Sequence, residues 1–361
     1  MKIMHLRSSE FFGGPERAIL GQCTNMTDHE FVCVSFIRRG EPNQFLKNAA
    51  VAGIETAMID DYCAGDFRVI SRLRKLVKRH NIDLLITHDY KGNFFGRLAL
   101  KKTGTAHIAH FRGVTAEDKK VSLYNFIDRQ VLKRMSTVLT VSEMSRKFLV
   151  GMGIPFEIIR VVPNAIDRSK FADSGYKREV PFNRTVRITA AGRLSFEKGY
   201  DNLLKAISLI VDKAPSFKVS IYGHGPEEEN LKKMAEDLKI NDFIEFCGFV
   251  DDILPVLKNS DFLVLPSRSE GMPNIILEAW AQKLGVLSAS VGGVPEMITP
   301  GISGLLSQPE NPESLSRQML FAIDYPDEMI KYGEVGYELV QDKYSYKRQS
   351  ELLNKIYSSV R

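Results

Sequence analysis

The stretch that decides the fold is Asp261-Phe-Leu-Val-Leu-Pro-Ser-Arg-Ser-Glu-Gly-Met-Pro-Asn-Ile-Ile-Leu-Glu-Ala-Trp280, which predicts a buried strand, a loop and the start of a helix. The apolar run Phe262–Leu265 is short enough for a parallel strand that is buried on both faces. Gly271 interrupts the chain, and Pro273 suits the first turn of a helix, where no N–H group is needed. A strand that delivers a helix N-terminus to a sheet edge places backbone N–H groups and the positive end of the helix dipole there. The stretch therefore predicts a site for an anionic ligand.

Two carboxylates bracket this turn, Glu270 in the loop and Glu278 in the helix. By residue type alone, the more common interpretation is that Glu270 is an acid near a helix start and Glu278 an acid on a solvated helix face. Many surface carboxylates contribute little. However, Ser269-Glu-Gly-Met-Pro-Asn-Ile-Ile-Leu-Glu-Ala279 resembles the E-x7-E signature of the retaining GT-B glycosyltransferases of family 4.

Further segments resemble the same family in order and approximate spacing. In the second half they are Ala191-Gly-Arg-Leu-Ser-Phe-Glu-Lys-Gly199, Tyr222-Gly-His-Gly-Pro226, Phe246-Cys-Gly-Phe-Val-Asp-Asp252 and Gly292-Gly-Val-Pro-Glu296. In the first half they are Phe12-Gly-Gly-Pro-Glu-Arg17, Thr140-Val-Ser-Glu143 and Val162-Pro-Asn-Ala-Ile-Asp167. The resemblance covers nearly the whole chain. It implies an α/β GT-B fold, with two Rossmann-like doubly wound domains that face a cleft and a C-terminal helix that crosses back to the first domain.

The length of the chain and its alternation of predicted strands and helices predict two domains. The 361 residues suffice for two hydrophobic cores, and short apolar runs alternate with helical patterns in both halves, as in doubly wound sheets. We predict an acceptor-side domain over 1–168, a polar linker over 169–184, a nucleotide-sugar-binding domain over 185–335 and a terminal helix over 336–361.

The composition is that of a globular protein, with 44% hydrophobic and 26% charged residues. No apolar run is long enough to cross a bilayer, and the N-terminus lacks the apolar segment of a signal peptide. The four cysteines show no CxxC spacing, which is typical of free thiols in a reducing compartment. The net charge of +5 suits anionic ligands or membrane surfaces and does not require nucleic acid. We expect a cytoplasmic protein that binds no nucleic acid, and peripheral contact with the inner face of the cytoplasmic membrane is an alternative that the sequence leaves open.

Two features of the first half bear on ligand binding. Gly13 and Gly14 stand at a strand-to-helix turn, where glycine lets a backbone approach a phosphate or simply allows a tight turn. His110 lies near the C-terminal end of the strand predicted at 106–112, at the edge where open α/β sheets bind ligands. By residue type His110 is more commonly structural, but the family places a histidine beside the donor sugar at this position. His107, earlier on the strand and expected on the same face, is the alternative if the register differs.

The segment 67–80 predicts an amphipathic helix with many arginines and lysines. A solvated face with buried side-chain stems is the commoner explanation of such a pattern. The alternative is a basic surface that rests on anionic lipid headgroups.

The resemblance assigns a donor site residue by residue. The catalytic residues would be His110, Arg193, Lys198 and Glu270. The donor-binding residues would be Gly13, Gly14, Gly192, Gly223, Phe249, Val250, Gly271, Met272, Pro273, Asn274, Ile275 and Glu278. Arginine offers a planar fork and lysine a mobile point charge to a diphosphate. Since no Asp-x-Asp motif stands in a suitable loop, we predict no metal and no cofactor.

The implied reaction is transfer of a sugar from a nucleotide-diphosphate sugar, with retention of configuration, to a glycan or lipid-linked acceptor. A UDP-sugar is favoured over a GDP-sugar, and bacterial cell-surface polysaccharide biosynthesis is the expected pathway. Two alternatives share the donor pocket: a GT-B nucleotide-sugar epimerase and a non-catalytic nucleotide-sugar-binding module. A nicotinamide-dependent oxidoreductase is disfavoured, because the first strand is not followed by G-x-G-x-x-G.

Overall fold

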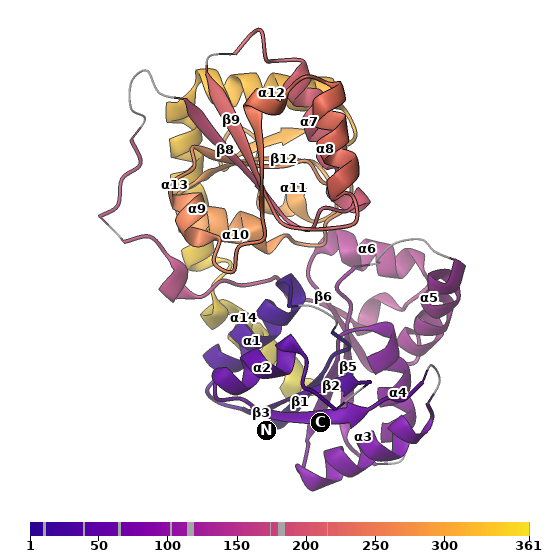
Figure 1. Cartoon of the computed structure of the whole chain (residues 1–361). Helices are drawn as coiled ribbons and strands as arrows, with labels where there is room; N and C mark the ends of the chain where they lie inside the picture. Colours follow the sequence, from indigo (N-terminus) through magenta and orange to yellow (C-terminus); the bar gives the residue numbers. More distant parts are fainter. Residues whose placement is uncertain are drawn as a thin grey trace. The chain divides into compact units, whose positions relative to one another are not determined.

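The computed structural model describes residues 1–9, 12–38, 40–63, 66–101, 103–113, 119–173, 175–179, 185–214 and 216–360. They form two compact units, each a Rossmann-like α/β domain (Figure 1). The first unit consists of Met1–Asn164 together with Tyr346–Arg361, and the second of Ala165–Ser345. The boundaries predicted after residues 168 and 335 differ from these limits.

The described part of the first unit contains a seven-stranded parallel sheet in the order β3-β2-β1-β4-β5-β6-β7. Its strands are β1 (Lys2–Leu6), β2 (Glu30–Ile37), β3 (Glu55–Asp60), β4 (Leu84–Thr87), β5 (Ala106–His110), β6 (Thr137–Thr140) and β7 (Ile159–Val161). Leu6 pairs with Thr87, so β1 and β4 end side by side. The strand order reverses between these two strands, which makes the β1/β4 edge the expected ligand-binding point of this sheet.

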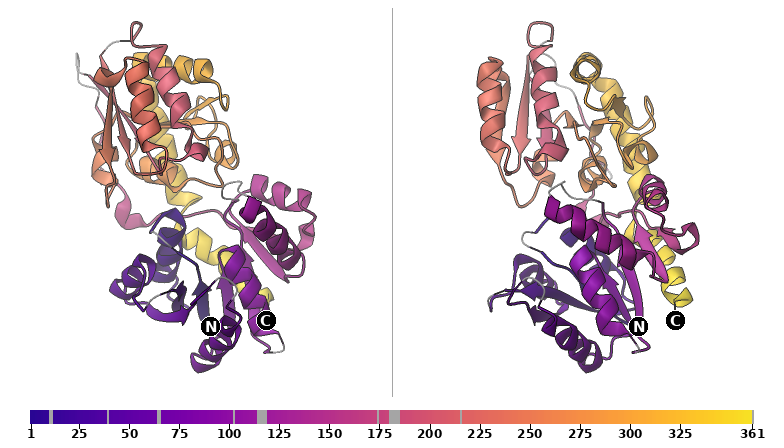
Figure 2. Two further views of the ribbon diagram at one scale, coloured as in Figure 1. Left: turned by 45° about the vertical axis from the view of Figure 1, so that its right-hand side comes forward. Right: turned by 90° about the vertical axis from the view of Figure 1, so that its right-hand side faces the viewer.

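Helices cover both faces of this sheet (Figure 2). One face packs against α1 (Gly14–Asn25), α2 (Gln44–Val51) and α14 (Tyr346–Ser359). The other packs against α3 (Arg68–Arg79), α4 (Tyr90–Leu100), α5 (Lys119–Leu132) and α6 (Glu143–Gly151). Helix α14 is the terminal helix predicted to return to the first domain. Its buried Tyr357 accepts a hydrogen bond from Gln22 Nε2 at 2.7 Å, so the last helix of the chain completes the core of the first unit.

The described part of the second unit contains a six-stranded parallel sheet in the order β10-β9-β8-β11-β12-β13. Its strands are β8 (Val186–Ala191), β9 (Phe217–Tyr222), β10 (Ile244–Gly248), β11 (Phe262–Leu265), β12 (Gly285–Ala289) and β13 (Leu305–Ser307). Helices α7 (Tyr200–Ser208), α8 (Glu228–Asp237) and α12 (Pro312–Asp324) share one core with the sheet. Helices α9 (Leu254–Lys258), α10 (Asn274–Ala281) and α13 (Pro326–Asp342) pack together on the other face. The strand predicted from the opening stretch, β11, is buried along its whole length.

Most of the predicted linker 169–184 is bound to the second unit. Arg178 donates hydrogen bonds to the carbonyl oxygens of Leu257 at 2.7 Å and Gln282 at 3.0 Å, and to that of Ser260. These carbonyls lie in the last turn of α9 or just after the ends of α9 and α10, where helical backbones leave acceptors unsatisfied, and one guanidinium has enough donors to serve all three. Residue 174 and residues 180–184 of the predicted linker lie outside the described residues.

Candidate functional site

The loops that follow β8 and β11 meet at the point where the strand order of the second sheet reverses. From β8 the chain moves outward through β9 and β10, then returns to β11 on the other side of β8. Ligands of open α/β sheets bind at such a point, outside the carboxyl ends of the strands. Two loops predicted to carry site residues, 192–199 and 266–273, are therefore neighbours in space.

An ion pair joins these two loops. Lys198 Nζ lies 2.6 Å from Glu270 Oε1, and Ser267 Oγ donates to the same carboxylate oxygen at 2.7 Å. The Glu270 side chain is only 8% exposed, while that of Lys198 is 24% exposed. The backbone carbonyl of Glu270 also accepts a hydrogen bond from the Gly293 N–H at 3.2 Å. Glu270 is thus fixed through its side chain and its backbone at once.

Two glycines permit this close packing of loops. Gly292 has φ +52°, and a Cβ there would lie 1.7 Å from the carbonyl oxygen of Glu270. Gly199 has φ +66°, and its Cβ would lie 2.2 Å from the carbonyl oxygen of Pro266. A side chain at either position would meet backbone atoms as well as an unfavourable φ. Gly199 is therefore required for the two loops to approach each other, and Gly292 is required for the loop after β12 to approach the backbone of Glu270.

A second ion pair, between Arg268 and Asp201, also holds these loops together. Arg268 Nη1 and Nη2 contact the two carboxylate oxygens of Asp201, in the first turn of α7, at 2.7 and 2.8 Å. The Arg268 N–H also donates to the carbonyl of Glu197 at 2.9 Å. This bidentate geometry is the strong form of an arginine–carboxylate pair. Sequence reasoning missed it, because the spacing of Arg268 and Asp201 along the chain gives no signal of contact.

Helix α10 carries Glu278 in its second turn. Glu278 is buried, and its Oε1 lies 3.7 Å from Lys170 Nζ. The prediction that Pro273 lies in the first turn is wrong by one residue: Pro273 is extended, with ψ 121°, and the helix begins at Asn274. An extended residue before the first helical one is the usual cap geometry, and proline is compatible with it.

The other residues predicted for this site surround the same edge. Arg193 and Phe249 are exposed, and the Phe249 N–H donates to His224 Nε2 at 3.3 Å. The Gly192 N–H donates to the carbonyl of Tyr222 at 2.9 Å, and the Gly223 N–H to that of Gly248 at 2.8 Å. Among the rest, the residues Met272 and Pro273 are buried, and Val250, Gly271, Asn274 and Ile275 are half-buried.

The corresponding point of the first sheet, after β1 and β4, is held by a partly buried ion pair. Arg7 Nε donates to Glu16 Oε1 at 2.6 Å, and Arg7 Nη1 donates to the carbonyl of His88 at 3.1 Å. Glu16 Oε2 accepts from the Gly13 N–H at 3.0 Å, and Gly13 is the residue before the first turn of α1. Gly13 and Gly14 thus lie where predicted, but the N–H of Gly13 is already bonded within the unit.

Next to this pair lies a buried row of histidines. His5 Nδ1 is 2.8 Å from His88 Nε2, and the rings of His88 and His110 lie 5.4 Å apart. Arg112 donates to the Nδ1 atoms of His88 and His110, each at 3.4 Å. Burial, followed by the charge of Arg112, lowers the pKa of His5 to about 3 and holds the pKa values of His88 and His110 well below their usual range.

This arrangement sets the proton position on His110. A neutral imidazole whose Nδ1 accepts a hydrogen bond carries its proton on Nε2. His110 Nε2 is buried and has no hydrogen-bond partner among the residues that the structure describes. At neutral pH, His110 is consequently a hydrogen-bond donor and not a general base.

His107 belongs to a different environment. Three positions separate it from His110, so the two side chains point to opposite faces of the sheet. His107 Nε2 lies 3.0 Å from Thr87 Oγ1, and its ring packs against Gly96 of α4. The expectation that His107 shares the face of His110 is wrong. The predicted catalytic residues fall in two units, with Lys198 and Glu270 brought into contact in the second.

Within the described ranges, no group of three or more histidine, cysteine, aspartate or glutamate side chains is arranged to hold a metal ion. The described helices include none that is both long enough and apolar enough to span a bilayer.

Two family models match the chain. "Glycosyltransferase Family 4" matches residues 12–170, and "Glycosyl transferases group 1" matches residues 177–339. An uncharacterized glycosyltransferase of Haemophilus influenzae is 26% identical over 360 residues, covering 94% of each chain. The GDP-mannose-dependent monoacylated alpha-(1-6)-phosphatidylinositol monomannoside mannosyltransferase of Corynebacterium glutamicum is 27% identical over 252 residues, covering 64% of this chain and 65% of its own.

Solved structures confirm the fold. The Anabaena protein Alr3699/HepE, in complex with UDP and glucose, superimposes with a TM-score of 0.87 and 18% sequence identity. The match covers 99% of this chain and 100% of that one. The two family models match consecutive parts of the chain. The match to the Anabaena structure includes both parallel sheets. The chain therefore belongs to the family 4 glycosyltransferases and has the GT-B fold.

Proposed function

We propose that this chain transfers a sugar from a UDP-sugar, with retention of the anomeric configuration, to a glycan or lipid-linked acceptor in bacterial cell-surface polysaccharide biosynthesis. The observation that carries the proposal is the Lys198–Glu270 pair at the reversal point of the second sheet. UDP in the complex of the Anabaena protein supports uracil as the base, whereas the Corynebacterium relative depends on GDP-mannose. The acceptor of that relative is a glycolipid by its name, which supports a lipid-linked acceptor.

The chemistry required at this site is stabilisation of a leaving diphosphate. Breaking the bond between sugar and diphosphate places negative charge on the phosphate oxygens. Lys198, Arg193 and the backbone N–H groups at the start of α10 are the donors that we assign to this charge. Removal of one fixed donor at a comparable site costs about 2.7–4 kcal/mol of transition-state stabilisation. We propose that these cations meet the demand without a metal ion.

The ion pair itself suggests how the donor is bound. Lys198 and Glu270 neutralise each other at 2.6 Å. A diphosphate draws the Lys198 ammonium, and the sugar hydroxyls can then donate to the Glu270 carboxylate, which Ser267 holds in place. Each of the two charges thereby exchanges its partner for part of the same ligand.

Two other residues complete the assignment. Glu278 is buried in the second turn of α10, where we place the ribose of the nucleoside, because a carboxylate can accept from both ribose hydroxyls. His110 offers its Nε2–H, which we assign to a sugar hydroxyl. A donor of this kind orients the sugar without taking up a proton.

We also propose that α3 touches anionic membranes. Val69, Leu73 and Val77 face the core, and most of the exposed positions of the helix are basic. Part of this charge is used within the unit, since Arg68 and Arg72 lie 2.7 and 3.1 Å from the carboxylate of Asp66. The attraction therefore depends on the outward-facing residues Lys75, Lys78 and Arg79, which are exposed.

A donor panel tests the proposed function. UDP-, GDP- and ADP-sugars should be compared by calorimetry and by slow donor hydrolysis, with the anomeric configuration of the released sugar followed by NMR at early times. We expect UDP-sugars to bind most tightly and to release the retained anomer first. Tight binding with neither hydrolysis nor transfer to any acceptor would favour a non-catalytic module, and release of the inverted anomer would refute retention.

A further inference from the structure

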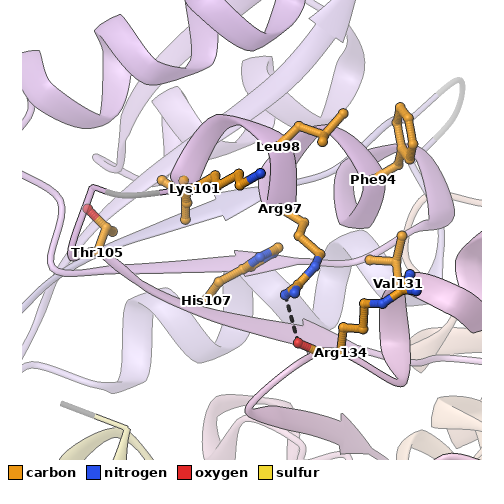
Figure 3. A pocket seen from close by; sticks show the side chains of 9 residues that line it. Phe94, Arg97, Leu98, Lys101, Thr105, His107, Val131 and Arg134 are labelled. Atoms are coloured by element: carbon orange, nitrogen blue, oxygen red, sulfur yellow. Dashed lines mark hydrogen bonds between the residues drawn. The ribbon is translucent and has the colours of Figure 1, made fainter.

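The first unit contains a cavity of about 460 Å³ at the end of its sheet opposite to His110 (Figure 3). It lies between the C-terminal parts of α4 and α5, over the first half of β5, and His107 of that strand lines it. Because β5 runs from Ala106 to His110, the cavity and the histidine row are at different ends and on different faces of the sheet. The cavity is therefore not part of the site described above.

Three cations line the cavity. Arg97 comes from α4, Lys101 follows α4, and Arg134 follows α5. Among the described residues that line it, none is an aspartate or a glutamate, and no ion pair is formed by these three side chains. His107 adds no charge, because burial and then the charge of Arg97 lower its pKa to about 3. The cavity thus carries uncompensated positive charge.

Helix capping explains only part of this charge. Arg97 Nη1 donates to the carbonyl of Arg134 at 2.7 Å, as the dashed line of Figure 3 shows. Arg74 Nε donates to the carbonyl of Ala99 at 3.0 Å at the end of α4. These bonds occupy carbonyl groups at two helix ends that would otherwise repel an anion. Arg97 has further N–H donors. The Lys101 side chain is exposed and makes no hydrogen bond or ion pair with the described residues.

The remaining lining is apolar. Phe94, Leu98 and Val131 contribute side chains from α4 and α5, and the volume is within the range of small-molecule sites. We propose that this cavity binds an anionic amphiphile, with a phosphate group at Arg97, Lys101 and Arg134 and the adjoining apolar carbons against Phe94, Leu98 and Val131. Guanidinium groups bind phosphate through paired hydrogen bonds, so Arg97 and Arg134 suit such a group.

A phosphate at this position could belong to a lipid headgroup or to free phosphate, and calorimetry on the full chain separates the two sources. We expect dihexanoyl phosphatidylglycerol, below its micelle concentration, to bind at least about tenfold more tightly than inorganic phosphate, since several buried methylene groups add to the affinity. Dihexanoyl phosphatidylcholine, whose choline cation faces three positive side chains, should bind weakly. Equal affinity for phosphatidylglycerol and inorganic phosphate would overturn the proposal that the ligand is an amphiphile. Absence of binding by all three would overturn the proposal that the cavity is a binding site.

Matched variants locate the binding. Lys101→Ala and Arg134→Ala should each weaken phosphatidylglycerol binding about tenfold, the loss expected for a charged hydrogen bond. Leu98→Trp should weaken it by filling the apolar part, whether or not the charges are intact. Lys47→Ala removes the same charge from α2, outside the cavity, and should change the affinity less than twofold.

Thermal unfolding checks that each variant is folded. If Lys47→Ala weakens binding as much as Lys101→Ala, diffuse surface charge explains the affinity and the cavity does not. Donor hydrolysis serves as an independent readout. It should be unchanged in all four variants, so failure of this inference and failure of the proposed function can be told apart.

Discussion

Mild acid should destabilise the first unit and spare the second. His5, His88 and His110 are buried in the first unit at 0%, 3% and 6% exposure, and each has a lowered pKa. In the unfolded chain a histidine titrates near pH 6.5. Below that pH the unfolded state binds protons that the folded state does not, so the free energy of unfolding falls as the pH falls.

The size of the effect follows from the number of groups. Each histidine that stays neutral when folded costs about 1.4 kcal/mol of stability between pH 7.5 and 5.5. His107 lies in the same unit and its pKa is also lowered, to about 3, so the four histidines together cost up to about 5.5 kcal/mol, a large share of the 5–15 kcal/mol typical of a domain. Asp128, whose pKa burial raises to about 6, acts in the opposite direction and returns less than about 1 kcal/mol over the same range.

Hydrogen exchange at pH 7.5 and 5.5, corrected for the intrinsic rate, measures this loss. Peptides from β1 and β4 should lose protection, while those from β8 and β11 should keep it, because His224 of the second unit has a side chain that is 62% exposed. His5→Phe removes one titrating group and should reduce the loss by about 1.4 kcal/mol. Equal losses in both units, or an unchanged loss in His5→Phe, would refute the assignment.

Three further predictions concern the diphosphate-binding cations, Asp128 and helix α3. Arg193→Ala and Lys198→Ala should each lower kcat by about two orders of magnitude or more, and full activity in either variant would remove that residue from the mechanism. Asp128 accepts a hydrogen bond from Asn93 Nδ2 at 2.8 Å, and Asp128→Asn keeps an acceptor oxygen there. Because the raised pKa of Asp128 costs stability when the carboxyl is ionised, this variant should stabilise the first unit at pH 8 by up to about 3 kcal/mol and have no effect below pH 4. Urea unfolding at the two pH values measures the difference. Binding to anionic vesicles through α3 should weaken as salt rises, since the attraction acts within ~10 Å at 0.1 M salt, and absence of binding at low salt would leave α3 an ordinary solvated helix.

The local part of this structure was accessible from the sequence. The apolar run Phe262–Leu265, followed by a loop with Gly271, predicts a buried strand that carries Glu270 to the sheet edge. In the structure the strand is buried and Glu270 lies in the loop that follows it. The basic helix predicted at 67–80 is α3, and the terminal helix is α14. Each follows from hydrophobic periodicity, which acts over a few residues.

The contacts between distant segments were not accessible. The Lys198–Glu270 pair and the Arg268–Asp201 clamp depend on which strands are neighbours, and single-sequence spacing does not contain the strand order. Arg178 turns a polar stretch that predicts a linker into a bound segment through carbonyls about 80–100 positions away. The cavity beside His107 results from space left between α4 and α5, which no residue pattern signals.

The central claim, that the second unit holds the nucleoside diphosphate through Glu278 and the sugar through Glu270, is tested most directly by calorimetry with UDP alone. UDP has no sugar beyond its ribose, so Glu278→Gln should weaken its binding by about 1.5–3 kcal/mol, the value of a lost charged hydrogen bond. Glu270→Gln should leave UDP affinity unchanged or slightly increased, because Lys198 no longer shares its charge with a carboxylate 2.6 Å away. If both variants lose affinity equally, or if only Glu270→Gln does, the two acids do not divide the donor as proposed.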